Sequence, residues 1–95
     1  MRIVWSLQAI ADFAALRAYI SQDDPAAAER MADRILHDIE TQLPANPRMG
    51  RPGRVPSTRE LVILKTPYIV PYRIEGHTIE ILRVYHGARR WPKRV

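Results

Sequence analysis

A proline- and glycine-rich segment divides the chain into two halves of different character. Between Pro44 and Thr58 there are four prolines and two glycines, Gly50 and Gly53. Proline lacks the backbone N–H that the interior of a helix or a central strand needs, so neither element can continue through this segment. With 95 residues in all, the two halves must share one hydrophobic core, and we expect a single domain over 1–95.

The half before this segment predicts a short strand and two helices. Arg2 to Trp5 reads as a strand, and Ser6 is placed to cap a helix that runs to about Ser21. Asp24 can cap a second helix over Pro25 to about Leu43. Apolar residues recur three or four apart in both helices, and the short link between them predicts an antiparallel hairpin.

The half after it predicts three strands in a meander. Runs rich in Val, Ile and Tyr cover Arg59 to Lys65, Tyr68 to Glu75, and Thr78 to Tyr85. A two-residue turn at Gly76 and His77 joins the last two. The expected fold is α+β, with an antiparallel helical hairpin on a small, mostly antiparallel sheet in the order strand, helix, helix, strand, strand, strand.

The two-residue turn also predicts which residues of the last two strands face each other. The pairs expected on the helix-facing side are Ile74 with Ile79, Tyr72 with Ile81, Val70 with Arg83, and Tyr68 with Tyr85. The pairs expected on the opposite face are Arg73 with Glu80, Pro71 with Leu82, and Ile69 with Val84, with His86 at the strand end.

No remaining segment covers that opposite face. Ile69, Leu82 and Val84 would then be exposed beside Arg73 and His86, which is typical of a docking surface. A bound partner would explain it, and a crystal dimer or a packed C-terminal tail would explain it equally well.

Positive charge dominates the sequence and is carried almost entirely by arginine. Lys and Arg number 15 against 10 Asp and Glu, for a formal charge of +5, and only Lys65 and Lys93 are lysines. Such a balance attracts polyanions or an acidic partner chain. Guanidinium groups suit bidentate binding of phosphate or carboxylate, although the codon bias of a GC-rich genome would enrich arginine as well.

Missing residue types exclude several classes of site. There are no cysteines, so disulfides and thiolate chemistry are excluded, and 3 scattered histidines argue against a metal site. No Walker loop, dinucleotide fingerprint or nucleophile elbow occurs. We expect no cofactor and no metal. Without a signal-peptide core or a run near the roughly 20 apolar residues of a membrane span, we expect no membrane association and a cytoplasmic protein.

The remaining chemistry is acid–base catalysis with electrostatic stabilisation. His86 is the best candidate for proton transfer, because imidazole titrates near neutrality and this one stands where a strand becomes a loop; the alternative is a structural role. The tail with Arg89, Arg90 and Trp91 could contact phosphates and stack on a base, or Trp91 could anchor it to the fold. RNA cleavage fits, since the ribose 2′-OH is a built-in nucleophile.

The other arginines have both a binding and a structural interpretation. Arg83, on the helix-facing side, needs a carboxylate or carbonyl partner if it is buried, and Arg73 lies across from Glu80 as in an ordinary ion pair. The arginines that lead from the loop toward the sheet could form a positive rim for nucleic acid: Arg48, Arg51, Arg54 and Arg59. Such runs are also common on solvated surfaces.

The whole chain resembles the RelE/ParE superfamily of bacterial type II toxins. The stretches that carry the resemblance are Val4-Trp5-Ser6 with Ala9 and Asp12, Gly50-Arg51-Pro52-Gly53-Arg54, Thr58-Arg59-Glu60-Leu61-Val62, Tyr68-Ile69-Val70-Pro71-Tyr72-Arg73, and Ile81-Leu82-Arg83-Val84-Tyr85-His86-Gly87-Ala88-Arg89. Their order and spacing together are specific. The resemblance implies a helical hairpin on a small antiparallel sheet and a partly disordered antitoxin encoded beside the toxin.

The superfamily divides by target, and the sequence has features of both divisions. RelE-like members cut mRNA in the ribosomal A site, whereas ParE-like members poison DNA gyrase without being nucleases. Known RelE-like nucleases have an arginine directly after the aromatic that opens the middle strand, and here that position is Ile69. Tyr72-Arg73 and Arg83-Val84-Tyr85-His86 resemble ParE members more, although a histidine at that strand end occurs in some RelE-like nucleases.

The function expected from the resemblance is a growth-inhibiting toxin with RelE-like, ribosome-dependent mRNA cleavage. The alternative is ParE-like inhibition of DNA gyrase, and a second alternative is a non-toxic basic module that binds nucleic acid or protein.

The resemblance also implies roles for particular residues. In a nuclease, His86 would be the general acid or base and Arg73, with Arg83 or Arg89, would stabilise the phosphate. Nucleic acid would be held by Arg51, Arg54, Arg59 and Arg90. The antitoxin would dock on the face that carries Ile69, Leu82 and Val84.

Overall fold

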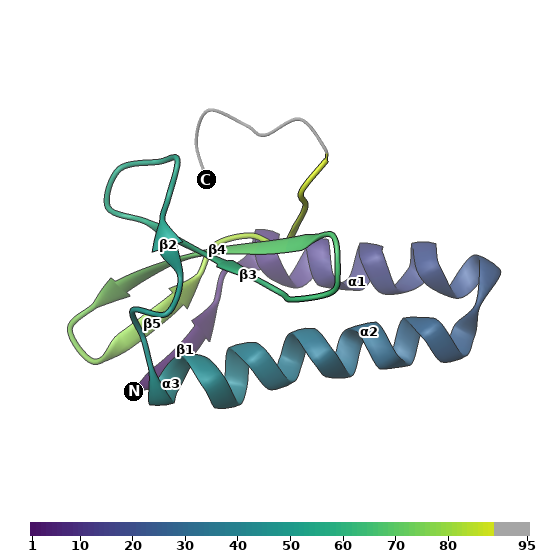
Figure 1. Cartoon of the computed structure of the whole chain (residues 1–95), viewed down its shortest axis with the longest axis horizontal. Helices are drawn as coiled ribbons and strands as arrows, with labels where there is room; N and C mark the ends of the chain where they lie inside the picture. The colour runs from purple at the N-terminus through teal and green to yellow at the C-terminus, as the bar shows by residue number, and fades with distance from the viewer. Residues whose placement is uncertain (89–95) are drawn as a thin grey trace.

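Two helices form one layer and a six-stranded sheet forms the other in the computed structural model, which describes residues 1–88 (Figure 1). The elements are β1 (Arg2–Trp5), α1 (Leu7–Asp23), α2 (Pro25–His37), the π-helical turn η1 (Asp38–Gln42), α3 (Leu43–Ala45), β2 (Arg51–Pro52), β3 (Arg59–Val62), β4 (Tyr68–Glu75), β5 (Thr78–Ile81) and β6 (Tyr85–His86). The α+β fold predicted from the sequence is confirmed. No helix within 1–88 is long and apolar enough to cross a membrane.

The two long helices begin where their caps predict. The Ser6 hydroxyl accepts a hydrogen bond from the Ala9 N–H (3.0 Å) at the start of α1, and the Asp24 carboxylate accepts one from the Ala27 N–H (3.1 Å) at the start of α2. The helix that α2 begins continues through η1 and α3, past the predicted end near Leu43. It widens at η1, where the Leu43 N–H reaches the Asp38 carbonyl five residues back.

The sheet is mixed, with the order β1-β5-β4-β3-β2, and β6 pairs with β4. β1 runs parallel to β5, and the other neighbouring strands are antiparallel. β3 ends earlier than predicted, at Val62 and not at Lys65. There the chain turns, because Lys65 has a positive φ of 64° and the Thr66 N–H and hydroxyl both donate to the Ile63 carbonyl.

The predicted register of the last hairpin is correct near its turn and wrong at its far end. Tyr72 lies opposite Ile81 and Ile74 opposite Ile79, as expected. The Leu82 N–H still donates to the Pro71 carbonyl (2.9 Å), after which the chain leaves the ladder and rejoins it one residue out of step, so that Tyr68 pairs with His86. This bulge forms because the Val84 N–H donates to an Asp12 carboxylate oxygen (3.0 Å) on α1 and not to β4.

The core lies between the helical layer and one face of the sheet. α2 and its continuation contribute Ile35, Ile39 and Leu43, all 0% exposed. The sheet contributes the residues predicted for its helix-facing side, among them Val70, Tyr72, Ile79 and Ile81. Alternation along the strands directs the intervening side chains to the other face of the sheet.

Candidate functional site

A pocket of about 380 Å³ opens between α1 and the end of the sheet where the bulge lies. Its lining combines aromatic, basic and acidic side chains: Asp12, Ala15, Leu16, Tyr19, Tyr68, Arg83, Val84, Tyr85 and His86. α1 and the segment that follows β5 position most of these residues, so the bulge determines the shape of the pocket.

An ion pair between Asp12 and Arg83 forms one wall. Arg83 donates from Nε to Oδ2 (2.7 Å) and from Nη2 to Oδ1 (3.0 Å). Hydrogen bonding to Asp12 raises the pKa of the Arg83 guanidinium above its ordinary value, so it stays charged. The predicted need of Arg83 for a carboxylate partner is confirmed, and its fork is engaged with protein and not presented to a phosphate.

Tyr85 stacks under that guanidinium. The Arg83 Cζ lies 4.7 Å from the centre of the Tyr85 ring, a cation–π contact. Burial raises the pKa of the Tyr85 phenol above its ordinary value, so Tyr85 is a neutral phenol at physiological pH. It can take part in hydrogen bonds there but cannot serve as a phenolate base.

His86 also lines the pocket, with its ring edge-on to Tyr68 at 5.6 Å between centroids. Its Nδ1 accepts a hydrogen bond from the Ala88 N–H (3.2 Å). Nδ1 is thereby engaged with the backbone, which leaves Nε2 as the ring nitrogen for a ligand. The bulge has moved His86 from the predicted open face to the side of Tyr68.

Arg73 lies apart from this pocket. Its Nη1 is 3.5 Å from Glu80 Oε1 and 3.8 Å from Glu75 Oε1, so the predicted ion pair with Glu80 is confirmed. Arg73 alternates with Tyr72 and therefore faces away from the helices. From Tyr68 to Arg73 an extended strand spans about 17 Å. Among the described residues of the proposed catalytic set, only His86 and Arg83 share a site. Arg89 of that set and Arg90 of the proposed nucleic-acid set lie outside the described residues.

The predicted exposed apolar face is wrong. Ile69, Leu82 and Val84 are only 9%, 7% and 5% exposed. Val84 belongs to the core, because the bulge turns it toward the helices. Gly87 lies against Ile69, since a Cβ at Gly87 would be 3.2 Å from the Ile69 Cδ1.

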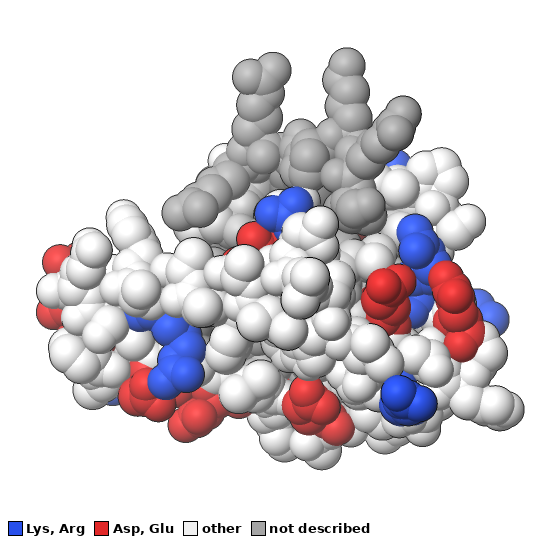
Figure 2. All heavy atoms as spheres, turned by 180° about the vertical axis from the view of Figure 1, so that it is seen from behind, with Lys and Arg blue, Asp and Glu red and all other residues white. Residues whose placement is uncertain are grey.

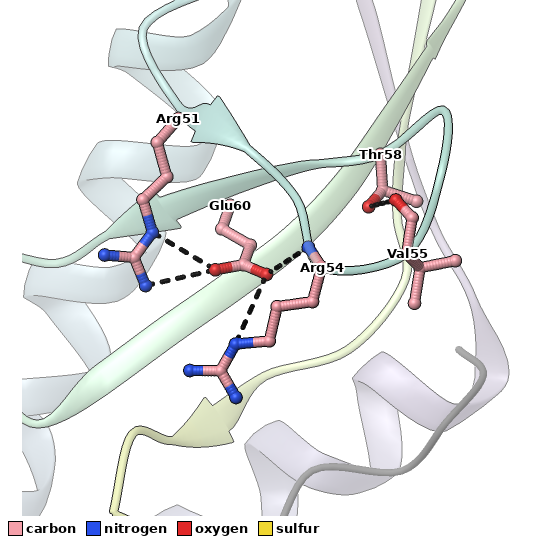
Figure 3. A network of polar contacts seen from close by, with 5 residues as sticks. All are labelled: Arg51, Arg54, Val55, Thr58 and Glu60. Carbon is pink, nitrogen blue, oxygen red and sulfur yellow. Dashed lines mark hydrogen bonds and ion pairs between the residues drawn. The ribbon is translucent and has the colours of Figure 1, made fainter.

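Two of the loop arginines of the predicted rim, Arg51 and Arg54, are engaged by Glu60 (Figure 3). Arg51 donates from Nε and Nη2 to Oε1 of Glu60 (3.2 and 3.1 Å), and Arg54 donates its backbone N–H to Oε2 (2.9 Å). Glu60 is only 3% exposed and lies, with Arg51, on the face of the sheet away from the helices. Arg59 alternates with it and donates from Nε to the Gly50 carbonyl (2.9 Å).

Charge is mixed on the surface as well. Figure 2 shows blue and red side chains interspersed among the described residues of the face that it presents. Among the described residues, no group of three acidic or histidine side chains could hold a metal. What this architecture offers is a small pocket lined by charged and aromatic side chains.

Comparison with known proteins identifies the family. Residues 3–91 match the sequence model of the ParE toxin of the type II toxin–antitoxin system parDE. This chain belongs to the ParE family of type II toxins. It is the toxin component of a toxin–antitoxin pair, within the wider RelE/ParE superfamily that the sequence resembles.

Two relatives of this ParE-family toxin are themselves named as toxins. The chain is 47% identical over 92 residues to the putative toxin Y4kP of Sinorhizobium fredii, covering 97% of this chain and 94% of that protein. It is 39% identical over 88 residues to toxin RelE2 of Caulobacter vibrioides, covering 93% of this chain and 97% of that protein.

Solved structures of toxin–antitoxin systems share its fold. A chain of the chromosomal ParDE system from P. aeruginosa has a TM-score of 0.78 and 32% identity, with 90% of this chain and 95% of that chain covered. A chain of the RelBE2 complex from Mycobacterium tuberculosis has a TM-score of 0.68 and 25% identity, with 93% and 92% covered. An antitoxin partner is therefore supported for this toxin too.

Three residues that hold the site of this toxin were not predicted as site residues. Asp12 holds the bulge, Glu60 gathers two arginines, and Tyr72 bonds to the proline-rich loop. The one available signal was at Glu60, an acidic residue opposite an apolar position of β4. For Asp12 and Tyr72 the signal lies in contacts between residues far apart in sequence.

The Glu60 network predicts a measurable loss of stability. Glu60→Gln removes the charge that neutralises Arg51 and Arg54 but keeps most of the shape, so we expect the free energy of unfolding to fall by about 1–2 kcal/mol. Urea denaturation measures it. Glu75→Gln, whose side chain is 69% exposed, is the control and should cost less than about 0.5 kcal/mol. Equal stability of the two variants would contradict this role of Glu60.

Proposed function

We propose that this toxin inhibits growth by ParE-like binding of DNA gyrase and not by RNA cleavage. The observation that carries the proposal is the separation of the groups that a cleavage centre would require. The His86 Nδ1 is engaged by the Ala88 N–H, Arg83 is engaged by Asp12, and Arg73 lies on the other face of the sheet. Acid–base catalysis needs these groups within hydrogen-bond reach of one phosphate.

The match to the ParE family supports the same choice, as does Ile69 where RelE-like nucleases have arginine. The outer side of α1 adds a further argument. Leu7 and Ile10, three residues apart on α1, are 82% and 52% exposed, and exposed apolar side chains of this size are characteristic of protein contacts. A protein target such as gyrase can use this surface, whereas an RNA backbone cannot.

RelE-like mRNA cleavage is the second candidate, and the pocket favours it. The pocket brings a charged arginine, a neutral phenol and an imidazole together within one cavity. Although the Arg83 fork is engaged by Asp12, its positive charge lies beside the pocket and could act on a phosphate bound there, with His86 transferring the proton.

His86→Ala tests the difference. For a gyrase inhibitor we expect growth inhibition in induced cells, and inhibition of supercoiling by purified gyrase, to stay within twofold of the unmodified toxin. Ile10→Asp places a charge on the exposed side of α1 and should weaken inhibition several-fold without unfolding the protein. A folded His86→Ala protein without toxicity, together with A-site cuts in mRNA from the unmodified toxin, would establish the nuclease instead.

A further inference from the structure

A second hollow, of about 470 Å³, lies where the proline-rich loop meets the turn between β4 and β5. Figure 1 shows these two segments at the same end of the sheet. This hollow, which we call the basic hollow, shares no lining residue with the pocket beside α1. Its lining residues are Arg48, Ser57, Thr58, Arg59, Ile74 and Gly76. Two arginines of the predicted rim, Arg48 and Arg59, therefore meet in one place.

The Arg59 guanidinium is held in position by the proline-rich loop. Its Nε donates to the Gly50 carbonyl (2.9 Å) and its Nη2 donates to the Arg48 carbonyl (3.1 Å). Gly50 is fixed in turn, because its N–H donates to the buried Tyr72 hydroxyl (3.0 Å). The Nη1 group of Arg59 takes part in neither bond, so its N–H donors are left for a ligand. A guanidinium that is already ordered loses little conformational entropy on binding.

The positive charge of the basic hollow is not neutralised within residues 1–88. Neither Arg48 nor Arg59 forms an ion pair there, and no acidic side chain is among the lining residues. Glu75 is next to Ile74 in sequence, but alternation places it on the other face of the sheet, where it lines a different hollow with Glu80. Two uncompensated guanidinium groups in one hollow favour the binding of an anion.

The other lining residues favour phosphate over an acidic peptide. Guanidinium groups bind phosphate oxygens two at a time, and the Ser57 hydroxyl is a further donor. Ile74 is the one large apolar side chain among the described lining residues, so the apolar side chains of a peptide have little to pack against. No aromatic ring lines the hollow on which a base could stack. Such a lining holds a nucleic-acid backbone without reading its sequence.

We propose that the basic hollow binds phosphate groups of the DNA duplex on which gyrase acts. The toxin then contacts the enzyme through the outer side of α1 and the DNA through Arg48 and Arg59. This rests on the gyrase inhibition proposed above for the source of the DNA, whereas the affinity of the hollow for a DNA backbone does not depend on it.

Reversing the charge of Arg48 tests the DNA contact. A labelled DNA duplex of arbitrary sequence is titrated with the purified toxin at low salt and followed by fluorescence anisotropy. We expect Arg48→Glu to lower the affinity at least tenfold. Arg30→Glu is the matched control, because Arg30 is also exposed but lies on α2 outside the hollow, and it should lower the affinity less than threefold. Equal losses, or a toxin without measurable affinity for DNA, overturn the proposal.

The salt dependence of the same binding tests whether Arg48 neutralises a phosphate. Removing one phosphate contact lowers the slope of log affinity against log salt concentration by about 1, so Arg48→Ala should show this decrease and Arg30→Ala should not. An unchanged slope in Arg48→Ala overturns the proposal. Binding of an RNA duplex of the same sequence at least tenfold more tightly than DNA overturns the assignment to DNA.

Purified gyrase separates this proposal from the function on which it rests. Arg48→Glu should weaken the inhibition of supercoiling several-fold, while its binding to gyrase without DNA stays within twofold of the unmodified toxin. An equal loss of binding to gyrase alone would assign the hollow to an acidic surface of the enzyme and overturn the proposal. A toxin that binds DNA through Arg48 but neither binds nor inhibits gyrase would refute the gyrase function and leave the DNA contact of the hollow established.

Discussion

Replacing Asp12 by alanine should lower the free energy of unfolding by about 3 kcal/mol. The Arg83 side chain is 27% exposed, so the substitution leaves a mostly buried guanidinium without its counter-charge. It also leaves the Val84 N–H without the carboxylate oxygen that holds the bulge. Thermal unfolding followed by circular dichroism should show a fall in Tm on the order of 10–20 °C.

A double substitution separates the ion pair from the bulge. Asp12→Ala with Arg83→Met replaces the pair by apolar groups and should recover part of the loss, because no buried charge remains. The matched surface pair Arg17–Glu29 is 44% and 62% exposed, and Arg17→Ala should cost less than about 1 kcal/mol. If Asp12→Ala cost no more than Arg17→Ala, the bulge would not depend on Asp12.

Tyr72→Phe should cost about 2–3 kcal/mol, although it removes a single oxygen atom. The Tyr72 hydroxyl donates to the Pro47 carbonyl (2.6 Å) and accepts from the Gly50 N–H (3.0 Å). Tyr72 is 0% exposed, so both backbone groups lose a partner where water cannot easily replace it. Chemical denaturation measures the loss, and hydrogen exchange at Gly50 should become faster in the folded protein.

Tyr19→Phe is the control for this prediction. Tyr19 is 63% exposed, so water replaces whatever its hydroxyl bonds, and the change should stay within about 0.5 kcal/mol. Gly50→Ala disturbs the same contact from the loop side. Its Cβ would lie 2.7 Å from the Tyr72 Cε1 and 2.9 Å from the Glu60 carbonyl oxygen. A Tyr72→Phe protein as stable as the Tyr19→Phe protein would show that the proline-rich loop keeps its position without the Tyr72 hydroxyl.

Together these contacts explain why the candidate site differs from the one that the sequence predicts. The Asp12 contact shifts β6 by one residue and places His86 beside Tyr68. The Glu60 and Tyr72 contacts hold the proline-rich loop against the sheet, and the loop arginines that pair with Glu60 stabilise this arrangement. Of the residues predicted to cleave or bind nucleic acid, Arg83 and His86 lie at the pocket, whereas Arg73 and Arg51 lie on the face of the sheet away from the helices.

Local signals in the sequence determined the elements of this protein. Ser6 and Asp24 mark the helix starts because a cap acts on an N–H within its own turn. The prolines and glycines after Pro44 end the helix and separate it from the strands. The turn at Gly76, which has a positive φ of 58°, establishes the register of the adjoining pairs. Such effects extend over a few residues, so they can be read from sequence.

The arrangement of the site was decided only by tertiary structure. Asp12 and Val84 are 72 positions apart, and no turn or periodicity near either residue shows that one accepts a hydrogen bond from the other. A ladder that slips by one residue reverses the face of every side chain beyond the slip. His86 and Val84 therefore ended on the helix side, because a carboxylate on α1 competed with β4 for one backbone N–H.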